Sequence, residues 1–140
     1  MNINIQKFLS PVFENGNNNS SDLRLAVQNG FPFSVFEAVQ KETGLTQKQM
    51  ATILGASVRT IARRKENNHF NAIESDILYR VARVLAYAVT VFGDIEKARV
   101  WLKRPNRGLG GEIPLNLLGT DIGSQQVEDV LHRINYGIYS

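Results

Sequence analysis

The stretch covering residues 46–65 constrains the fold more than any other part of this chain. Thr46 and Gln49 have the spacing of a capping box, in which each side chain accepts a hydrogen bond from a backbone N–H at the start of a helix. Gly55 can adopt the positive φ that commonly ends a helix, and Ser57 can cap the helix that follows. The sequence therefore predicts two short helices joined by a tight turn, a helix-turn-helix.

The apolar residues of this stretch stand where two crossing helices need them. Ala51 falls at the crossing point, where only a small side chain fits between the backbones. Ile61 returns from the second helix to the core between the two, and Val58 is expected to point inward beside it. This agreement among small, turn-forming and branched residues favours a helix-turn-helix over an ordinary helical hairpin.

Basic charge is concentrated in the same region. The 140 residues carry a formal net charge of only +3, yet residues 44–65 contain Lys and Arg and no acidic residue. A recognition helix uses its N-terminal residues to reach base edges and its cations to neutralise phosphates. We therefore predict DNA binding, with a solvated basic face as the alternative. The candidate DNA-binding residues are Ser57, Arg59 and Thr60 toward the bases, and Arg63, Arg64 and Lys65 toward the phosphates.

The part of the chain before the helix-turn-helix divides into an arm and two helices. Residues 1–21 are polar and low in complexity toward their end, which is typical of an arm and linker. Asp22 is expected to cap a short helix that stops near Gly30. Ser34 and Glu37 have the spacing of a second capping box, so a helix that braces the helix-turn-helix is expected to begin there.

The longest predicted helix follows the basic region and ends at Gly93. Asn71 and Glu74 repeat the capping pattern at its start. From Ile73 to Phe92, apolar residues recur at three- and four-residue spacing around too broad a stripe for a lone surface helix. This helix is expected to form a spine that joins both halves of the chain.

Shorter helices complete an all-α fold. Asp94 is expected to cap a helix that closes at Pro105, Pro114 to begin a one- or two-turn helix, and Ser124 to cap the last helix. The glycine-rich residues 106–111 follow no strand and lack the Gly-Lys-Ser/Thr sequence of a phosphate-binding loop, so we interpret them as a chain turn. No stretch shows the sustained alternation typical of an exposed sheet.

Composition excludes several classes of site. The chain has no cysteine and only two histidines, which argues against disulfides and metal sites. No apolar run is long enough for a membrane span, and the N-terminus lacks the pattern of a signal peptide, so a cytoplasmic protein is expected. Glu74 and Asp76 lie two apart on a helix and point in different directions, and Ser75 is best interpreted as a hydrogen-bonding serine. We therefore expect no enzyme activity.

A set of segments distributed over most of the chain is informative as an ordered combination. The segments are Arg59-Thr60-Ile61, Arg63-Arg64-Lys65, Glu74-Ser75-Asp76, residues 80–84, Val91-Phe92-Gly93-Asp94, residues 98–102, Pro105-Asn106, Leu109-Gly110-Gly111, residues 113–118 and residues 127–137. Together they resemble the Xre-MbcA-ParS antitoxin family, from about Leu23 to the C-terminus. The combination is far more specific than any one of its motifs.

The resemblance implies a bacterial type II antitoxin. In that family an Xre-like helix-turn-helix region, here residues 22–70, precedes a helical toxin-binding domain, here residues 71–140. The implied partner is a RES-domain toxin that consumes NAD, and the antitoxin would block its active site. As a homodimer or in complex, the chain would also bind operator DNA and repress its own operon. The NAD chemistry then belongs to the toxin, so this chain needs no cofactor.

Two regions have the composition of a protein-binding surface. One is the loop with Arg104, Asn106, Arg107 and Leu109, next to Trp101, which we expect in the core. The other is the C-terminal tail, with Tyr136, Ile138, Tyr139 and Ser140. Two other functions remain open from the residues alone: a stand-alone transcription regulator without a toxin partner, and an interaction module whose helix-turn-helix has lost DNA binding.

Overall fold

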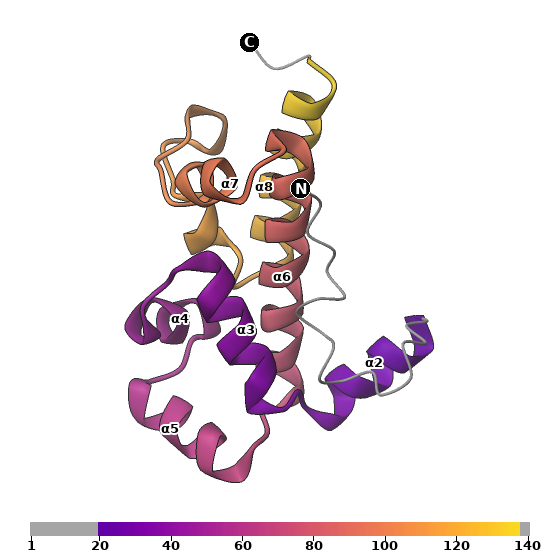
Figure 1. Ribbon diagram of the computed structural model, residues 1–140, viewed down its shortest axis with the longest axis vertical. Helices are drawn as coiled ribbons and strands as arrows, with labels where there is room; N and C mark the ends of the chain where they lie inside the picture. Colours follow the sequence, from indigo (N-terminus) through magenta and orange to yellow (C-terminus); the bar gives the residue numbers. More distant parts are fainter. Residues whose placement is uncertain (1–19, 138–140) are drawn as a thin grey trace. The chain divides into compact units, whose positions relative to one another are not determined.

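The computed structural model describes residues 20–137, and every regular element in that range is a helix (Figure 1). These residues form two compact units, 20–79 and 80–137. The predicted arm and linker, residues 1–21, lies outside the described residues except for its last two, which belong to a helix. The all-α fold class is confirmed: within residues 20–137 the only ladder pairing is one isolated antiparallel bridge, between Asn106 and Glu112.

The first unit contains four complete helices and the start of a fifth. They are α2 (Ser20–Asn29), α3 (Phe33–Thr43), α4 (Gln47–Leu54), α5 (Val58–Asn67) and the beginning of α6 (Ala72–Phe92). Helix α2 begins at Ser20, so the prediction that Asp22 caps it was wrong. The capping role predicted for Ser34 was wrong as well, because α3 already begins at Phe33. Its first N–H finds an acceptor elsewhere: Phe33 donates to the Asn68 side chain over 3.2 Å.

Three phenylalanine rings form the centre of this unit. The ring centroids of Phe33, Phe36 and Phe70 lie between 5.0 and 5.7 Å apart in stacked arrangements. Phe31 binds the same region through its backbone: its N–H donates to the Ser75 hydroxyl over 2.8 Å, and its carbonyl accepts from the Phe70 N–H over 3.0 Å. The segment before α3 is thereby attached to the residues around the start of α6.

The start of α6 is a capping box, as predicted. The Asn71 side chain accepts from the Glu74 N–H over 2.8 Å, and the Glu74 carboxylate accepts from the Asn71 N–H over 3.0 Å. Ile73 was expected in the inward stripe but is exposed. The reason is that Glu74 and Ser75 turn their side chains into the protein for hydrogen bonding, which leaves Ile73 on the outer side of the first turn.

The second unit contains the rest of α6 followed by short elements. These are α7 (Ile95–Leu102), the 3-10 helices η1 (Arg107–Leu109) and η2 (Pro114–Leu117), and α8 (Asp121–Asn135). The predictions that Asp94 caps α7 and that Pro114 begins a short helix are confirmed. The prediction for Ser124 was wrong: α8 begins three residues earlier, because the Thr120 hydroxyl accepts from the Gly123 N–H and caps it there.

Arginines on α6 connect this helix to the end of the second unit. Arg83 Nε donates to the Glu128 carboxylate of α8 over 2.8 Å, and its Nη2 lies 3.3 Å from the hydroxyl of the buried Ser124. Arg80 donates to the Leu118 carbonyl over 3.0 Å. Polar contacts therefore fix the start of α8 against α6. Among residues 20–137, no helix has the length and apolar character needed to cross a membrane.

Candidate nucleic-acid interface and partner surface

The helix-turn-helix forms between α4 and α5 as the sequence predicts. Thr46 and Gln49 make both hydrogen bonds of the capping box, at 3.1 and 2.8 Å. Gly55 has φ of 66° and ends α4, and the Ser57 side chain caps α5 by accepting from the Thr60 N–H. Ala51 and Ile61 are both buried. These contacts fix the angle at which α5 leaves the turn.

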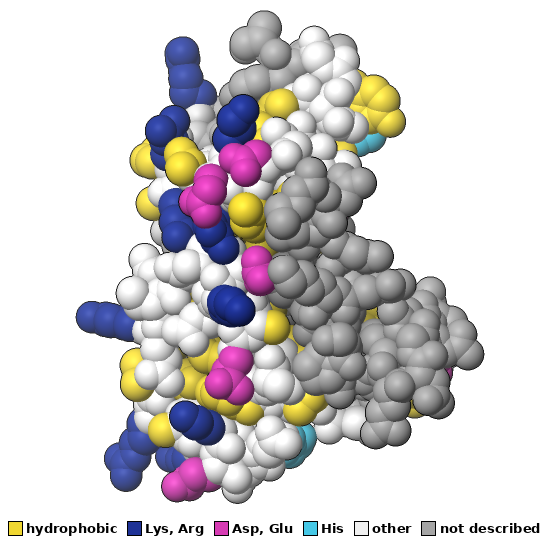
Figure 2. All heavy atoms as spheres, in the orientation of Figure 1, with side chains coloured by type: hydrophobic (Ala, Val, Ile, Leu, Met, Phe, Trp, Pro, Cys, Tyr) yellow, Lys and Arg dark blue, Asp and Glu magenta, His cyan; other side chains and the backbone are white. Residues whose placement is uncertain are grey.

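Helix α5 presents a cationic outer face. Arg59, Arg63 and Lys65 are exposed, and Figure 2 shows dark-blue Lys and Arg side chains at the lower left, where Figure 1 places α5. Lys65 also lies 6.0 Å from the centroid of the Phe33 ring, close enough for a weak cation–π attraction. Three of the predicted DNA-binding cations are thus available to a polyanion.

Val58 does not point into the core, and that prediction was wrong. Its side chain is 47% exposed at the first position of α5, whereas Ile61 is fully buried. The inward face of α5 is defined by Ile61 and Arg64. At about 100° per residue, Val58 lies roughly a quarter turn from the centre of that face. It therefore borders the outer face.

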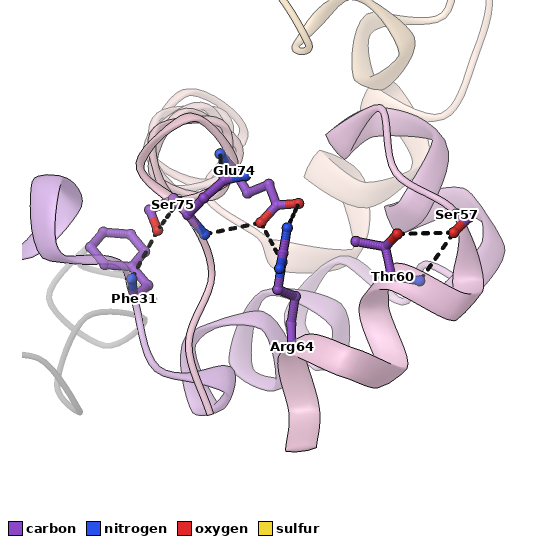
Figure 3. Close-up of polar contacts among 7 residues, drawn as sticks. Phe31, Ser57, Thr60, Arg64, Glu74 and Ser75 are labelled. Atoms are coloured by element: carbon purple, nitrogen blue, oxygen red, sulfur yellow. Dashed lines mark hydrogen bonds and ion pairs between the residues drawn. The ribbon is translucent and has the colours of Figure 1, made fainter. Parts of the chain in front are cut away.

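Ser57 and Thr60 use their hydroxyl groups on each other. Ser57 Oγ accepts from the Thr60 N–H and donates to Thr60 Oγ1, both over 3.0 Å (Figure 3). A hydroxyl has one donor, so in this arrangement the Ser57 donor is already engaged. Thr60 keeps its own hydroxyl donor. While it caps α5, the Ser57 hydroxyl therefore has no hydrogen-bond donor left for a base edge.

Arg64 has a partner inside the protein. Its Nε and Nη2 donate to the two carboxylate oxygens of Glu74 at 2.8 and 3.3 Å (Figure 3). The side chains of Arg64 and Glu74 are 26% and 7% exposed, so most of the pair is shielded from water. The sequence showed the capping role of Glu74 but gave no sign of this pair, because its members lie on different helices. The pair joins α5 to the start of α6.

The predicted toxin-binding loop is a compact turn. The Asn106 side chain accepts from the Gly108 N–H over 2.8 Å, and its backbone pairs with Glu112. Asn106 therefore shapes the loop, while Arg104 and Arg107 are exposed. Leu109 lines a cavity of about 430 Å³ together with residues of α8. The other lining residues are Gly108, Gly110, Gln126, Asp129, Val130 and Arg133.

Trp101 is not a full member of the core. It is partly exposed, and its ring lies 5.8 Å from that of Phe92. The two rings and the exposed Val100 line an open apolar groove of about 400 Å³. Arg104, predicted as a toxin contact, stands at the edge of this groove. The loop and the groove thus share one residue.

Aromatic side chains gather where α8 ends. Tyr136 is exposed and its ring lies 4.6 Å from that of His132, whose Nδ1 is 3.3 Å from the Tyr87 hydroxyl. Burial raises the pKa of Tyr87, and repulsion from Tyr136 and Glu128 adds to the effect. The predicted contacts Ile138, Tyr139 and Ser140 lie outside the described residues.

Sequence reasoning did not find Tyr87 and His132. They are 45 positions apart, so only the fold brings them together. Among residues 20–137, no three His, Asp or Glu side chains converge as ligands of a metal ion would. The chemistry that these surfaces offer is recognition by charge, aromatic contact and shape.

Two family models match successive parts of this chain. The family model described as the antitoxin Xre-like helix-turn-helix domain matches residues 22–83, and that described as the antitoxin Xre/MbcA/ParS C-terminal toxin-binding domain matches residues 88–137. Antitoxin Xre of Photorhabdus laumondii is 34% identical over 120 residues, which cover 84% of this chain and 81% of that protein. Antitoxin Xre of Yersinia enterocolitica is 30% identical over 117 residues, or 82% and 79% of the two chains.

One solved structure is also similar in fold. It is a chain in the crystal structure of the MbcT–MbcA toxin–antitoxin complex of M. tuberculosis, with a TM-score of 0.58 and 24% sequence identity. The match covers 88% of this chain and all of that one. At this level of identity the likeness concerns the fold.

Proposed function

Because this chain belongs to the Xre/MbcA/ParS antitoxin family, we propose that it neutralises a toxin through residues 71–140 and binds operator DNA through residues 22–70. The observation that carries the proposal is that two antitoxin domains account for nearly all of residues 22–137. A helix-turn-helix with an exposed cationic face lies in the first of them. The chain's own part in this function is binding, with no reaction step.

The toxin that we propose is a RES-domain enzyme that consumes NAD, as the family resemblance implies. Two surfaces of the second unit support a role in binding it. The exposed Arg104 lines the groove that holds the Phe92 and Trp101 rings, and Arg107 is exposed in the loop that follows. Arginine and aromatic side chains are enriched at the centres of protein interfaces. Tyr136 presents a second aromatic surface just before the tail. We propose that the loop and the tail, including Ile138, Tyr139 and Ser140, contact the toxin and block its active site.

For the DNA, we propose that a homodimer, alone or with the toxin, binds the promoter of its own operon and represses it. A two-fold symmetric dimer would place two α5 helices in successive major grooves of a palindromic site. Arg59 and Arg63 lie on the outer face of α5, which supports contacts with bases and phosphates. Arg64 is paired with Glu74, so we propose that it affects DNA binding indirectly, by holding α5 in position.

The toxin assignment is tested by expressing this chain with the protein encoded beside it. We expect the neighbour alone to stop growth and deplete cellular NAD, and this chain to restore both and to co-purify with it. Deleting residues 136–140 should abolish the rescue, because the deletion removes Tyr136 and the tail that we propose to contact the toxin. Ile122→Ala, at an exposed site near the other end of α8, is the control and should rescue fully. A harmless neighbour that does not co-purify would leave a stand-alone DNA-binding regulator as the better account.

The DNA assignment is tested by Arg63→Ala. This variant should weaken binding to the promoter duplex several-fold and reduce the slope of log affinity against log salt by about 0.9 for each phosphate that is no longer neutralised, hence about twice that for a dimer. Lys103→Ala, which removes an exposed charge outside the helix-turn-helix, should leave the slope unchanged. Arg63 is the better choice than Arg64, whose removal would also leave Glu74 without its partner. Equal salt slopes for the wild type and Arg63→Ala would contradict a phosphate contact by Arg63.

A further inference from the structure

Val58 is an apolar residue that packing within the protein leaves exposed at the start of α5. It is the first residue of α5, and 47% of its surface is exposed although the side chain is purely apolar. In a helix-turn-helix this end of the second helix enters the major groove first. An apolar side chain there can make no hydrogen bond to a base edge, so any contact it makes with DNA must be with an apolar group.

The neighbours of Val58 leave it accessible. Ala62, one turn later on the same side of α5, is exposed and small, so a surface can approach closely along this side. Ser57 is the residue before Val58, and its hydroxyl already donates a hydrogen bond to Thr60 Oγ1. Beside this apolar strip, Arg59 and Arg63 form a parallel cationic strip on the outer face. The outer face of α5 thus combines an apolar edge with positive charge, which complements the charge of a DNA duplex.

The major groove offers one apolar group that identifies a base, the C5-methyl group of thymine. From this match we propose that Val58 contacts a thymine C5-methyl group and gives the operator a requirement for a T·A pair at that position. The inference rests on the proposed operator binding and adds to it the base that one residue reads. Arg59 and Arg63 would hold α5 in the groove, while Val58 supplies the discrimination.

The test replaces single thymines by deoxyuridine, which removes the methyl group and keeps the base pairing. The promoter duplex from upstream of this chain's own gene is footprinted with the full chain, with and without the toxin. Each thymine in the protected region is then replaced in turn, and affinity is measured by fluorescence anisotropy at constant salt. For the wild type, we expect one position per half-site at which deoxyuridine weakens binding about fourfold, the effect of one methyl group left unburied.

Val58→Ala should bind the thymine duplex about as weakly as the wild type binds the deoxyuridine duplex, with no further loss on the latter. Val58→Thr, which keeps one γ-methyl group, should retain part of the discrimination. Ile122→Ala is the control, since Ile122 is also an exposed apolar residue but lies on α8, and it should discriminate as the wild type does. Far-UV circular dichroism checks that each variant is folded.

Two results would overturn the inference while leaving operator binding intact: a wild type that tolerates deoxyuridine at every protected thymine, or a Val58→Ala variant that still discriminates fourfold. If the chain binds no promoter DNA with or without the toxin, both the operator binding and the inference are overturned. The two failures are therefore distinguishable in one series of titrations.

Discussion

Replacing Glu74 by alanine is expected to lower the free energy of unfolding by about 3 kcal/mol. The substitution removes the carboxylate that accepts from Arg64 Nε at 2.8 Å, from Arg64 Nη2 at 3.3 Å and from the Asn71 N–H at 3.0 Å. It leaves the largely shielded guanidinium without an opposite charge and the first turn of α6 without its capping side chain. Urea denaturation of the full chain measures the change.

Glu74→Gln separates the contribution of the charge from that of the capping hydrogen bond, and Glu37→Ala serves as a control. Glu74→Gln keeps an acceptor for the Asn71 N–H but loses the charge, so it should be less destabilising than Glu74→Ala. Glu37→Ala, at an exposed site on α3, should change the free energy of unfolding by no more than about 0.5 kcal/mol. If Glu74→Ala is no more destabilising than Glu37→Ala, the pair contributes nothing to stability.

The second large effect is expected from Gly123→Ala, at about 2–3 kcal/mol of destabilisation. A Cβ atom on Gly123 would lie 2.0 Å from the Leu117 carbonyl oxygen and 3.0 Å from the Thr120 hydroxyl oxygen. The first of these is a backbone atom at the end of η2, so the loop between η2 and α8 must move. The melting temperature of the chain and its co-purification with the toxin should both fall.

The control for this variant is the preceding residue. Ile122→Ala removes more atoms than Gly123→Ala adds, yet Ile122 is exposed and its loss should leave the melting temperature nearly unchanged. A Gly123→Ala variant as stable as the wild type would mean that the η2–α8 turn relaxes without cost. The close approach of the Leu117 carbonyl to Gly123 would then not affect the stability of the chain.

Local signals predicted most of the fold. The capping boxes at Thr46 and Asn71 formed as expected because their partners lie three residues away, within one turn of the chain. Ser34 and Ser124 look like caps by the same local rule. Neither serine caps its helix, because another side chain accepts a hydrogen bond from the first turn. The Asn68 side chain accepts from the Phe33 N–H at the start of α3, and Thr120 caps α8. At these two helices an acceptor outside the predicted pattern serves the first turn.

The candidate sites were less predictable, because their side chains find partners through the fold. Arg64 could not be distinguished from Arg63 by charge or spacing, yet only Arg64 meets the Glu74 carboxylate. Val58 was expected inside since valine is apolar, but its position on α5 depends on where Ile61 and Arg64 face. Helical periodicity specifies which residues share a face; the angle of that face to its neighbours comes from tertiary contacts.

The backbone bonds of Phe31 bear on how small a self-sufficient DNA-binding fragment can be. Phe31 donates to Ser75, which is 44 positions away, and Arg64 depends on Glu74. A fragment cut at residue 70 would keep the whole helix-turn-helix and still leave a buried N–H and a shielded guanidinium without acceptors, each costing about 1–3 kcal/mol. The first turn of α6 therefore belongs to the folding unit of the helix-turn-helix, and a fragment meant to fold alone has to continue beyond Ser75.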